Sequence, residues 1–312
     1  MWTPTASSSS RESRRTCWSC ARGRRSSGDS WASTWGTATA SRSSRGTRCC
    51  FATTIPSKRC CERSAPTTSE AAESSPVSGL SFTLTDSALQ CLLQLTNAGF
   101  PTGAFSHSYG LETYVQAGTV HDLETFRAFA RAYLQQALAP TDGAVVGLVH
   151  RAVGERAWEP VVRLDRTLTA LKVAREPRAA SLKTGRALLR VATEVFRTGI
   201  LERYAALVAS GEARGNLAVA FGCVMGSATV SAEVAVLAFL TSSVTSLTAV
   251  ATRLIPLSPT AAQRLVREFH EDITRATLGA VARREDQLAS SVPAIDIAAM
   301  RHERLYSRLY MS

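Results

Sequence analysis

The spacing of apolar residues after residue 85 restricts the fold most. They recur every three or four positions, as on one face of an α-helix, and runs that alternate between apolar and polar residues are almost absent. One such stripe is Phe126, Phe129, Tyr133 and Leu138, whose helix Pro140 is expected to end. Further helices are expected at 86–95, 144–152, 158–174, 177–196, 201–209, 217–224, 232–254 and 258–282. The spacing predicts an all-α fold, a single domain of about ten helices.

Residues 1–80 have a different composition and are expected to lie outside that domain. They carry 12 Lys and Arg against 5 Asp and Glu, a net charge of +7, and hold six of the eight cysteines, with almost no Leu, Ile or Val. Such a segment cannot bury enough apolar surface to form an ordinary core. We interpret 1–80 as a disordered extension, or as an artefact of a start placed upstream of the true one. A Pro-, Ser- and Glu-rich linker at 67–79 joins it to the folded part, 81–312.

Three other interpretations of residues 1–80 are open. Cys17 and Cys20 could start a zinc module, but the other cysteines form adjacent pairs, which lack the spacing that wraps a tetrahedral metal. The Arg- and Ser-rich start is similar to an organelle transit peptide, yet it shows no amphipathic apolar face. A nucleic-acid-binding arm would use its arginines on phosphates, although the Arg22–Arg25 cluster is short.

Composition also bears on the compartment. No unbroken run of 18 apolar residues occurs, and the long apolar segment 232–254 contains Ser, Thr and Glu233, so we expect it to be buried among helices rather than in a membrane. Cys91 and Cys223 lie in apolar helical contexts and are expected to be buried thiols. A reducing cytoplasm fits this pattern.

Several kinds of chemistry have no motif in this sequence. It contains neither the P-loop pattern nor the Gly-x-Gly-x-x-Gly pattern after a strand, so no nucleotide cofactor is expected. The five histidines are scattered without the spacing of a stable metal site, so no metal ligands are assigned. They are His107, His121, His150, His270 and His302.

The segment 99–112, Gly-Phe-Pro-Thr-Gly-Ala-Phe-Ser-His-Ser-Tyr-Gly-Leu-Glu, lies between two expected helices. Ser106, His107 and Glu112 suggest a hydrolase triad, but adjacent side chains diverge in both strand and helix, so Ser106 and His107 do not pair easily. Turn chemistry explains the segment better. Pro101 fixes φ, Gly103 and Gly110 allow positive φ, and Ser106 or Ser108 is expected to cap the following helix.

The residues 95–112 also resemble the N-terminal motif of the UreF family of urease accessory proteins, Pro-x-Gly-x-Phe-x-His-Ser-x-Gly-Leu-Glu. Four further segments resemble family motifs in the same order: 142–144, 184–190, 216–222 and 293–310. The resemblance covers about 84–312 and does not extend to 1–80. At 257–260 this chain has Leu-Ser-Pro-Thr where relatives usually have a Gly-Gln-Thr turn, and Pro259 still suits the first position of a helix.

The resemblance implies an all-helical, dimeric, non-enzymatic protein of the cytoplasm. Its partners would be UreD (also called UreH), the GTPase UreG and the urease apoprotein, into which nickel is inserted. No cofactor, membrane or nucleic acid is implied. Two alternatives are a hydrolase that uses Ser106 and His107, and a basic nucleic-acid-binding helical protein; the near balance of 24 basic and 20 acidic residues in 81–312 disfavours the second.

The resemblance also suggests which residues bind partners. The turn would shape an interaction surface, with Phe105 and Leu111 packed beneath it and His107, Tyr109 and Glu112 near its edge. The C-terminal tail 293–312 would be disordered alone and fold on UreD, with Arg308 near the surface that recruits UreG. Aromatic and Arg residues at helical spacing in the tail are of the types that concentrate binding energy at interfaces. The expected partner-binding residues are Phe105, His107, Tyr109, Glu112, Tyr114, Arg301, Glu303, Tyr306, Arg308 and Leu309.

Overall fold

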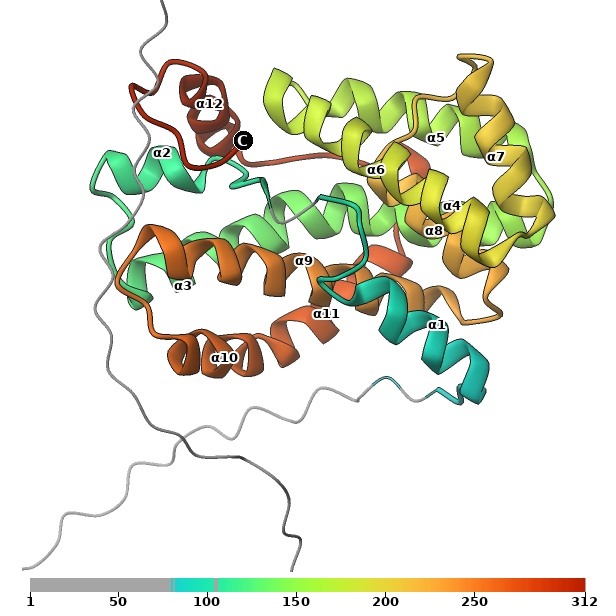
Figure 1. Ribbon diagram of the computed structural model, residues 1–312, viewed down its shortest axis with the longest axis horizontal. Helices are drawn as coiled ribbons and strands as arrows, with labels where there is room; N and C mark the ends of the chain where they lie inside the picture. The colour runs from blue at the N-terminus through green and yellow to red at the C-terminus, as the bar shows by residue number, and fades with distance from the viewer. Residues whose placement is uncertain (1–79, 81, 104–105, 312) are drawn as a thin grey trace, which may run out of the picture. The chain divides into compact units, whose positions relative to one another are not determined.

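The computed structural model describes residues 80, 82–103 and 106–311, which belong to one compact unit, 71–312 (Figure 1). The expectations for the extension 1–80 and for Phe105 therefore lie outside the described residues, apart from Leu80. The described part is helical, with one isolated β-bridge between His107 and Met311, which confirms the all-α prediction. Its helices are α1 (Asp86–Thr96), α2 (Leu111–Gln116), α3 (Leu123–Tyr133), η2 (Leu134–Gly143), α4 (Ala144–Gly154), α5 (Trp158–Leu171), α6 (Arg175–Phe196), α7 (Gly199–Ala209), α8 (Leu217–Ser227), α9 (Ala232–Leu254), α10 (Pro259–Glu268), α11 (His270–Val281), η3 (Glu285–Gln287) and α12 (Pro293–His302).

The core forms where α4, α8 and α9 pack together. Almost all of α8 is buried, because α4, α6, α7 and α9 surround it. Gly222 and Gly226 let α8 approach α4 closely: an added Cβ would lie 3.0 Å from side-chain atoms of Val149 and Val153, respectively. Helix α9 is long and apolar enough to cross a membrane, but 61% of its apolar window is buried against other helices. The prediction that 232–254 is buried among its neighbours is confirmed.

The prediction that Pro140 ends a helix is wrong. Residues 134–143 form the π-helix η2, and α3, η2 and α4 follow one another without a break. Proline has no N–H to donate to a helical ladder, and in an α-helix its ring clashes with the carbonyl four residues earlier, whereas a π-helix pairs residues five apart. Here that carbonyl, of Gln136, accepts a hydrogen bond from the Ser291 backbone N–H (3.1 Å), and the Thr141 hydroxyl donates to the next carbonyl, of Ala137 (2.6 Å). The freed backbone groups are satisfied from outside the helical ladder, so the chain continues as a helix.

The segment 258–282 was predicted as one helix and is two. Helix α10 begins as expected, with Ser258 as its N-cap and Pro259 in its first turn. The break falls at Phe269, whose ψ of −6° departs from the helical value. Its side chain is fully buried, with the Arg131 guanidinium 5.7 Å from the ring centre. The chain thus bends at the buried Phe269 instead of continuing as one straight helix.

A buried carboxylate joins α5 to the loop between α7 and α8. Asp165 accepts hydrogen bonds from the backbone N–H groups of Arg214, Gly215 and Asn216 at 2.5, 2.8 and 3.1 Å. It also accepts from the Tyr204 hydroxyl at 3.1 Å. Burial and the Asp165 charge raise the pKa of Tyr204 well above its usual value, which keeps this donor protonated. The sequence analysis did not identify Asp165, whose partners lie 39 to 51 residues further along the chain.

Candidate functional site

The turn predicted from the sequence has the backbone geometry that its glycines allow. Gly103 and Gly110 have φ values of +75° and +83°, which confirms the expected positive φ. Tyr109 also has a positive φ, +51°, which is uncommon for a residue with a side chain. Pro101 is exposed, whereas Leu111 is fully buried, as predicted.

The capping prediction for this turn is wrong. The N-cap of α2 is Gly110, which has no side chain to cap with, and the Leu111 N–H donates to the Ser108 carbonyl instead. The Ser106 hydroxyl donates to the Gly103 carbonyl at 3.0 Å, so it caps the turn and not the helix. The hydroxyl of Ser108 is buried without a partner among the described residues.

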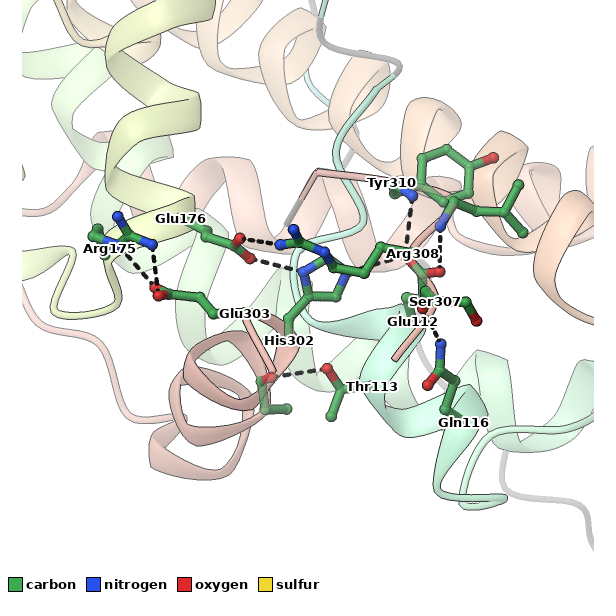
Figure 2. Close-up of polar contacts among 12 residues, drawn as sticks. Glu112, Thr113, Gln116, Arg175, Glu176, His302, Glu303, Ser307, Arg308 and Tyr310 are labelled. Carbon is green, nitrogen blue, oxygen red and sulfur yellow. Dashed lines mark hydrogen bonds and ion pairs between the residues drawn. The ribbon is translucent and has the colours of Figure 1, made fainter. Parts of the chain in front are cut away.

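The C-terminal segment folds back on this turn. Helix α12 lies beside α2, and the Thr113 hydroxyl donates to the Ala298 carbonyl at 2.9 Å (Figure 2). Beyond α12, the Met311 N–H donates to the Ser106 carbonyl and the Ser108 N–H to the Met311 carbonyl, at 2.8 and 3.0 Å. Gly110 lets α12 pack closely against the turn, because a Cβ at this position would lie 3.2 Å from the Ile295 carbonyl oxygen of α12. The turn and the tail thus form one structural unit.

Glu112 is the anchor of the tail. Its side chain is buried, and its carboxylate accepts hydrogen bonds from the backbone N–H groups of Leu309 (2.7 Å) and Tyr310 (3.1 Å) (Figure 2). The same carboxylate lies 3.0 Å from His302 Nε2. A buried carboxylate is retained only where hydrogen bonds or charges compensate its lost hydration, and the tail supplies all of these.

His302 lies between two carboxylates. Its ring is completely buried, and its Nδ1 lies 2.7 Å from Glu176 on α6, opposite the contact with Glu112. Both ring nitrogens donate only when each carries a proton, which is the imidazolium form. Arg308 donates to the other oxygen of Glu176 at 3.0 Å. Glu112, His302, Glu176 and Arg308 thus form one network that joins α2 and α6 to the tail (Figure 2). It runs from the buried His302 to the exposed Arg308.

A second ion pair lies at the rim of this network. Arg175 donates two hydrogen bonds to Glu303, at 3.1 and 2.6 Å. This bidentate contact lowers the pKa of the Glu303 carboxyl and raises that of the Arg175 guanidinium. Both groups are solvated, so the pair orients the end of α12 more than it stabilises the fold.

A small, mainly apolar cavity of about 60 Å³ lies between η2, α5 and α12, and charged side chains of Asp142, Lys172 and Asp296 border it. The Lys172 ammonium lies 2.8 Å from the Asp142 carboxylate in its wall. Burial raises the pKa of Tyr109 to about 12, and the Asp142 charge adds to this effect. Burial also raises the pKa of Asp296, against the opposing effect of Lys172. The sequence analysis named Asp142 only as part of a motif and missed Lys172 and Asp296.

The structure places the predicted partner-binding residues in two environments. His107 and Glu112 are buried, not at the edge of a surface as expected, and Tyr109 and Tyr114 are half-buried. Arg301, Tyr306, Arg308 and Leu309 are exposed, and Glu303 is partly exposed. The tail also differs from the expectation that it is disordered alone, because Pro293–His302 forms helix α12 and the side chains of His302 and Tyr310 are buried. Glu112 and Arg308 meet in one network, which His302 and Glu176 complete, and Glu303 lies in the ion pair at its rim. The sequence analysis assigned no role to His302 or Glu176.

No cluster of three or more His, Cys, Asp or Glu side chains within the described part of the chain could hold a metal ion. Cys223 is buried and Cys91 half-buried, and burial raises the pKa of both thiols. The prediction of a buried thiol is confirmed for Cys223, whereas Cys91 is only half-buried.

Comparison with known proteins agrees with this arrangement. Residues 120–270 match the family model UreF. Over 221 residues, 71% of this chain and 96% of the relative, the sequence is 40% identical to the urease accessory protein UreF of Paenarthrobacter aurescens strain TC1. Identity to the proteins of the same name is 36% in Lachnoclostridium phytofermentans and 33% in Bacillus sp. strain TB-90, over 97% and 99% of their lengths and 71% and 72% of this chain. An all-helical protein with these relatives is one of the urease accessory proteins. Within that class, the chain belongs to the UreF family.

Proposed function

We propose that this protein is a non-enzymatic, cytoplasmic accessory protein of urease maturation. It binds UreD (UreH), and the two together recruit the GTPase UreG so that nickel is inserted into the urease apoprotein. Membership of the UreF family supports the role in urease maturation. The proposal that UreD and UreG are its partners is supported by the surface that the tail presents.

The observation that carries the proposal is the concentration of exposed apolar side chains on the tail. The described residues include 11 large hydrophobic side chains that are exposed, and five of them fall within 297–311. They are Ile297, Met300, Tyr306, Leu309 and Met311. Tyr306 and Leu309 are the most exposed of all 11, at 106% and 74%. Exposed apolar residues gathered on one segment are typical of a protein–protein interface.

The network beneath the tail gives this surface a fixed shape. Glu112 and Glu176 hold the backbone at 309–310 and the side chains of His302 and Arg308, so Tyr306 and Leu309 project from an anchored segment. A preorganised surface loses less entropy on binding. The network thus supports a role for Glu112 and His302 in presenting the binding residues rather than in contacting the partner.

The contacts of Ser106 and Glu112 support a non-enzymatic role. The Ser106 hydroxyl donates to a backbone carbonyl, and both oxygens of Glu112 accept hydrogen bonds from the tail. A serine nucleophile needs its hydroxyl directed at a base, and that base needs a third group to orient it. In this arrangement Ser106 and Glu112 are engaged in structural contacts.

Co-purification tests the proposal directly. UreD and UreG are co-expressed with the tagged full chain, either unchanged or as Arg308→Ala, and we expect the substitution to abolish UreG recovery. Arg175→Ala is the matched control, because it also removes an exposed arginine that pairs with a glutamate of this region. Retention of UreG by Arg308→Ala, or equal loss in the control, would contradict the role given to Arg308. Failure of the unchanged chain to recover UreD would contradict the proposed function as a whole.

We also propose that the protein forms a homodimer through the face of α1 and α9. An apolar groove of about 770 Å³ lies there, lined by Leu92, Leu237 and Val250 among others. Leu89 and Leu93 of α1 are exposed at 43% and 59%, and Leu89 borders the groove. The exposed leucines of α1 in one copy could enter the groove of a second copy, and the reverse, as a twofold contact requires. A second copy would thus cover both.

A further inference from the structure

The Gly-Arg motif at 184–190 is not used by the proposed function, and its geometry is unusual. Gly185 on α6 lies against the loop between α7 and α8, where an added Cβ would overlap the backbone of Gly215, Asn216 and Leu217. Gly215 has a φ of +87°, and a Cβ there would lie 2.8 Å from the side-chain stem of Arg186. The two glycines therefore let α6 and the loop interlock, with the Arg186 side chain lying across the loop.

Two guanidinium groups are fixed on this loop. Arg186 Nε donates to the Arg214 carbonyl at 3.0 Å, and Arg166 Nε, from α5, donates to the Glu212 carbonyl at 2.9 Å. Asp165 holds the same loop from below through three backbone N–H groups. Each guanidinium thus uses its Nε donor on the protein and keeps its paired Nη groups for another acceptor. Such a fork matches a carboxylate.

Positive charge accumulates around these two groups. Residues 163–214 contain 11 Lys and Arg and 5 Asp and Glu, a net charge of +6, whereas the whole of 81–312 has a net charge of only +4. We define the Arg186 surface as Arg166, Lys183, Arg186, Arg190 and Arg214, all of which are exposed. Lys183, Arg186 and Arg190 follow one another at helical spacing on α6, which packs against α7 and α8 (Figure 1). Three other cations of 163–214, Arg163, Lys172 and Arg175, pair with acidic residues outside the segment, so they do not add to the charge of this surface.

None of these five cations takes part in an ion pair among the described residues. The five acidic residues of the segment form no ion pair with them among the described residues: Asp165 is buried beneath the loop, Glu176 pairs with His302 and Arg308, and the other three are exposed. Like charges held close together repel one another, and an external anion bound between them would reduce this repulsion.

We propose that the Arg186 surface docks a carboxylate-rich segment of a protein partner. The proposal goes beyond the proposed function, because this surface shares no residue with the tail network. A protein ligand fits better than a nucleic acid, because the glutamates interspersed among the arginines would repel a continuous polyphosphate, whereas an acidic peptide can place neutral residues opposite them. The fixed forks supply orientation as well as charge.

Fluorescence anisotropy with a labelled, glutamate-rich peptide of about 12 residues tests this inference on the full chain at low salt. The double variant Arg166→Glu with Arg186→Glu is expected to weaken binding about tenfold or more. The control, Arg156→Glu with Arg264→Glu, changes the net charge equally at exposed arginines elsewhere and is expected to leave the affinity within about twofold. Arg166→Gln with Arg186→Gln, which adds no negative charge, is expected to weaken binding by an intermediate factor.

Three results would overturn the inference. Equal weakening in the two charge-reversed variants would mean that the peptide responds to net charge alone. The absence of measurable binding by the unchanged chain would mean that the surface is merely solvated. Tighter binding of a single-stranded oligonucleotide of matched length, lost in the same double variant, would assign the surface to nucleic acid. Unfolding curves of each variant verify that the fold is intact, and the Gln pair provides a folded test if the Glu pair fails.

Discussion

Gly110 is the residue on which the contact between the turn and the tail depends. Its φ of +83° is open to glycine and strained for other residues, and α12 passes so close that the Ile295 carbonyl oxygen would lie 3.2 Å from a Cβ. Gly103 has a similar φ, but nothing lies within 4 Å of its Cβ position. A side chain at Gly103 would therefore only strain the backbone, whereas a side chain at Gly110 would also collide with α12.

We expect Gly110→Ala to destabilise the fold by about 2 kcal/mol and Gly103→Ala by about 1 kcal/mol. Both substitutions strain the backbone, but only the first displaces α12. Urea unfolding of the two variants measures the difference. Equal losses of free energy would show that α12 moves aside without cost and would contradict the role given to Gly110.

Single residues also mark the limit of prediction from the sequence. The local motif led to Gly103, Gly110 and the burial of Leu111, because turn chemistry depends on neighbours in the chain. It did not lead to His302, whose partners Glu112 and Glu176 lie 190 and 126 residues away. A lone histidine at the end of a helix carries no sign of a buried network. Its place becomes evident only when α2, α6 and α12 meet.

At the scale of helices, apolar periodicity predicted most of the elements, because burial of one stripe is what makes a helix stable in a protein. The prediction of helix ends failed where contacts with residues distant in the sequence changed the local outcome. Pro140 removes one donor from the ladder, yet the chain widens into a π-helix, the Ser291 N–H donates to the Gln136 carbonyl, and the helix continues. Phe269 continues the apolar pattern, yet its burial bends the chain between α10 and α11.

The loop between α7 and α8 gives a test at the same scale. Asp165→Asn keeps the size of the side chain but directs an amide towards N–H groups, and we expect a loss of about 3 kcal/mol in the free energy of unfolding. Backbone amides 214–216 should also exchange faster with deuterium. Asp286→Asn, at an exposed ion pair, is the control and should leave both observables unchanged. Unaltered exchange at 214–216 in the Asp165 variant would contradict the anchoring role.

At the scale of the molecule, the exposed leucines of α1 test the proposed dimer. Light scattering of the unchanged chain should give twice the monomer mass, and Leu93→Glu should reduce it to that of one chain. Leu278→Glu changes a leucine of α11 that is exposed at 40%, so it controls for the added charge. A dimer that survives Leu93→Glu would place the contact elsewhere.

The central claim is that the anchored tail presents a partner-binding surface. The most direct measurement is the affinity of the full chain for purified UreD, with and without the double substitution Tyr306→Ser and Leu309→Ser. These side chains are exposed at 106% and 74%, so their loss should leave the unfolding free energy unchanged. We expect the dissociation constant to rise about 100-fold, as for two aromatic or apolar anchors at an interface. An affinity within about twofold of the unchanged chain, with the fold intact, would contradict the claim.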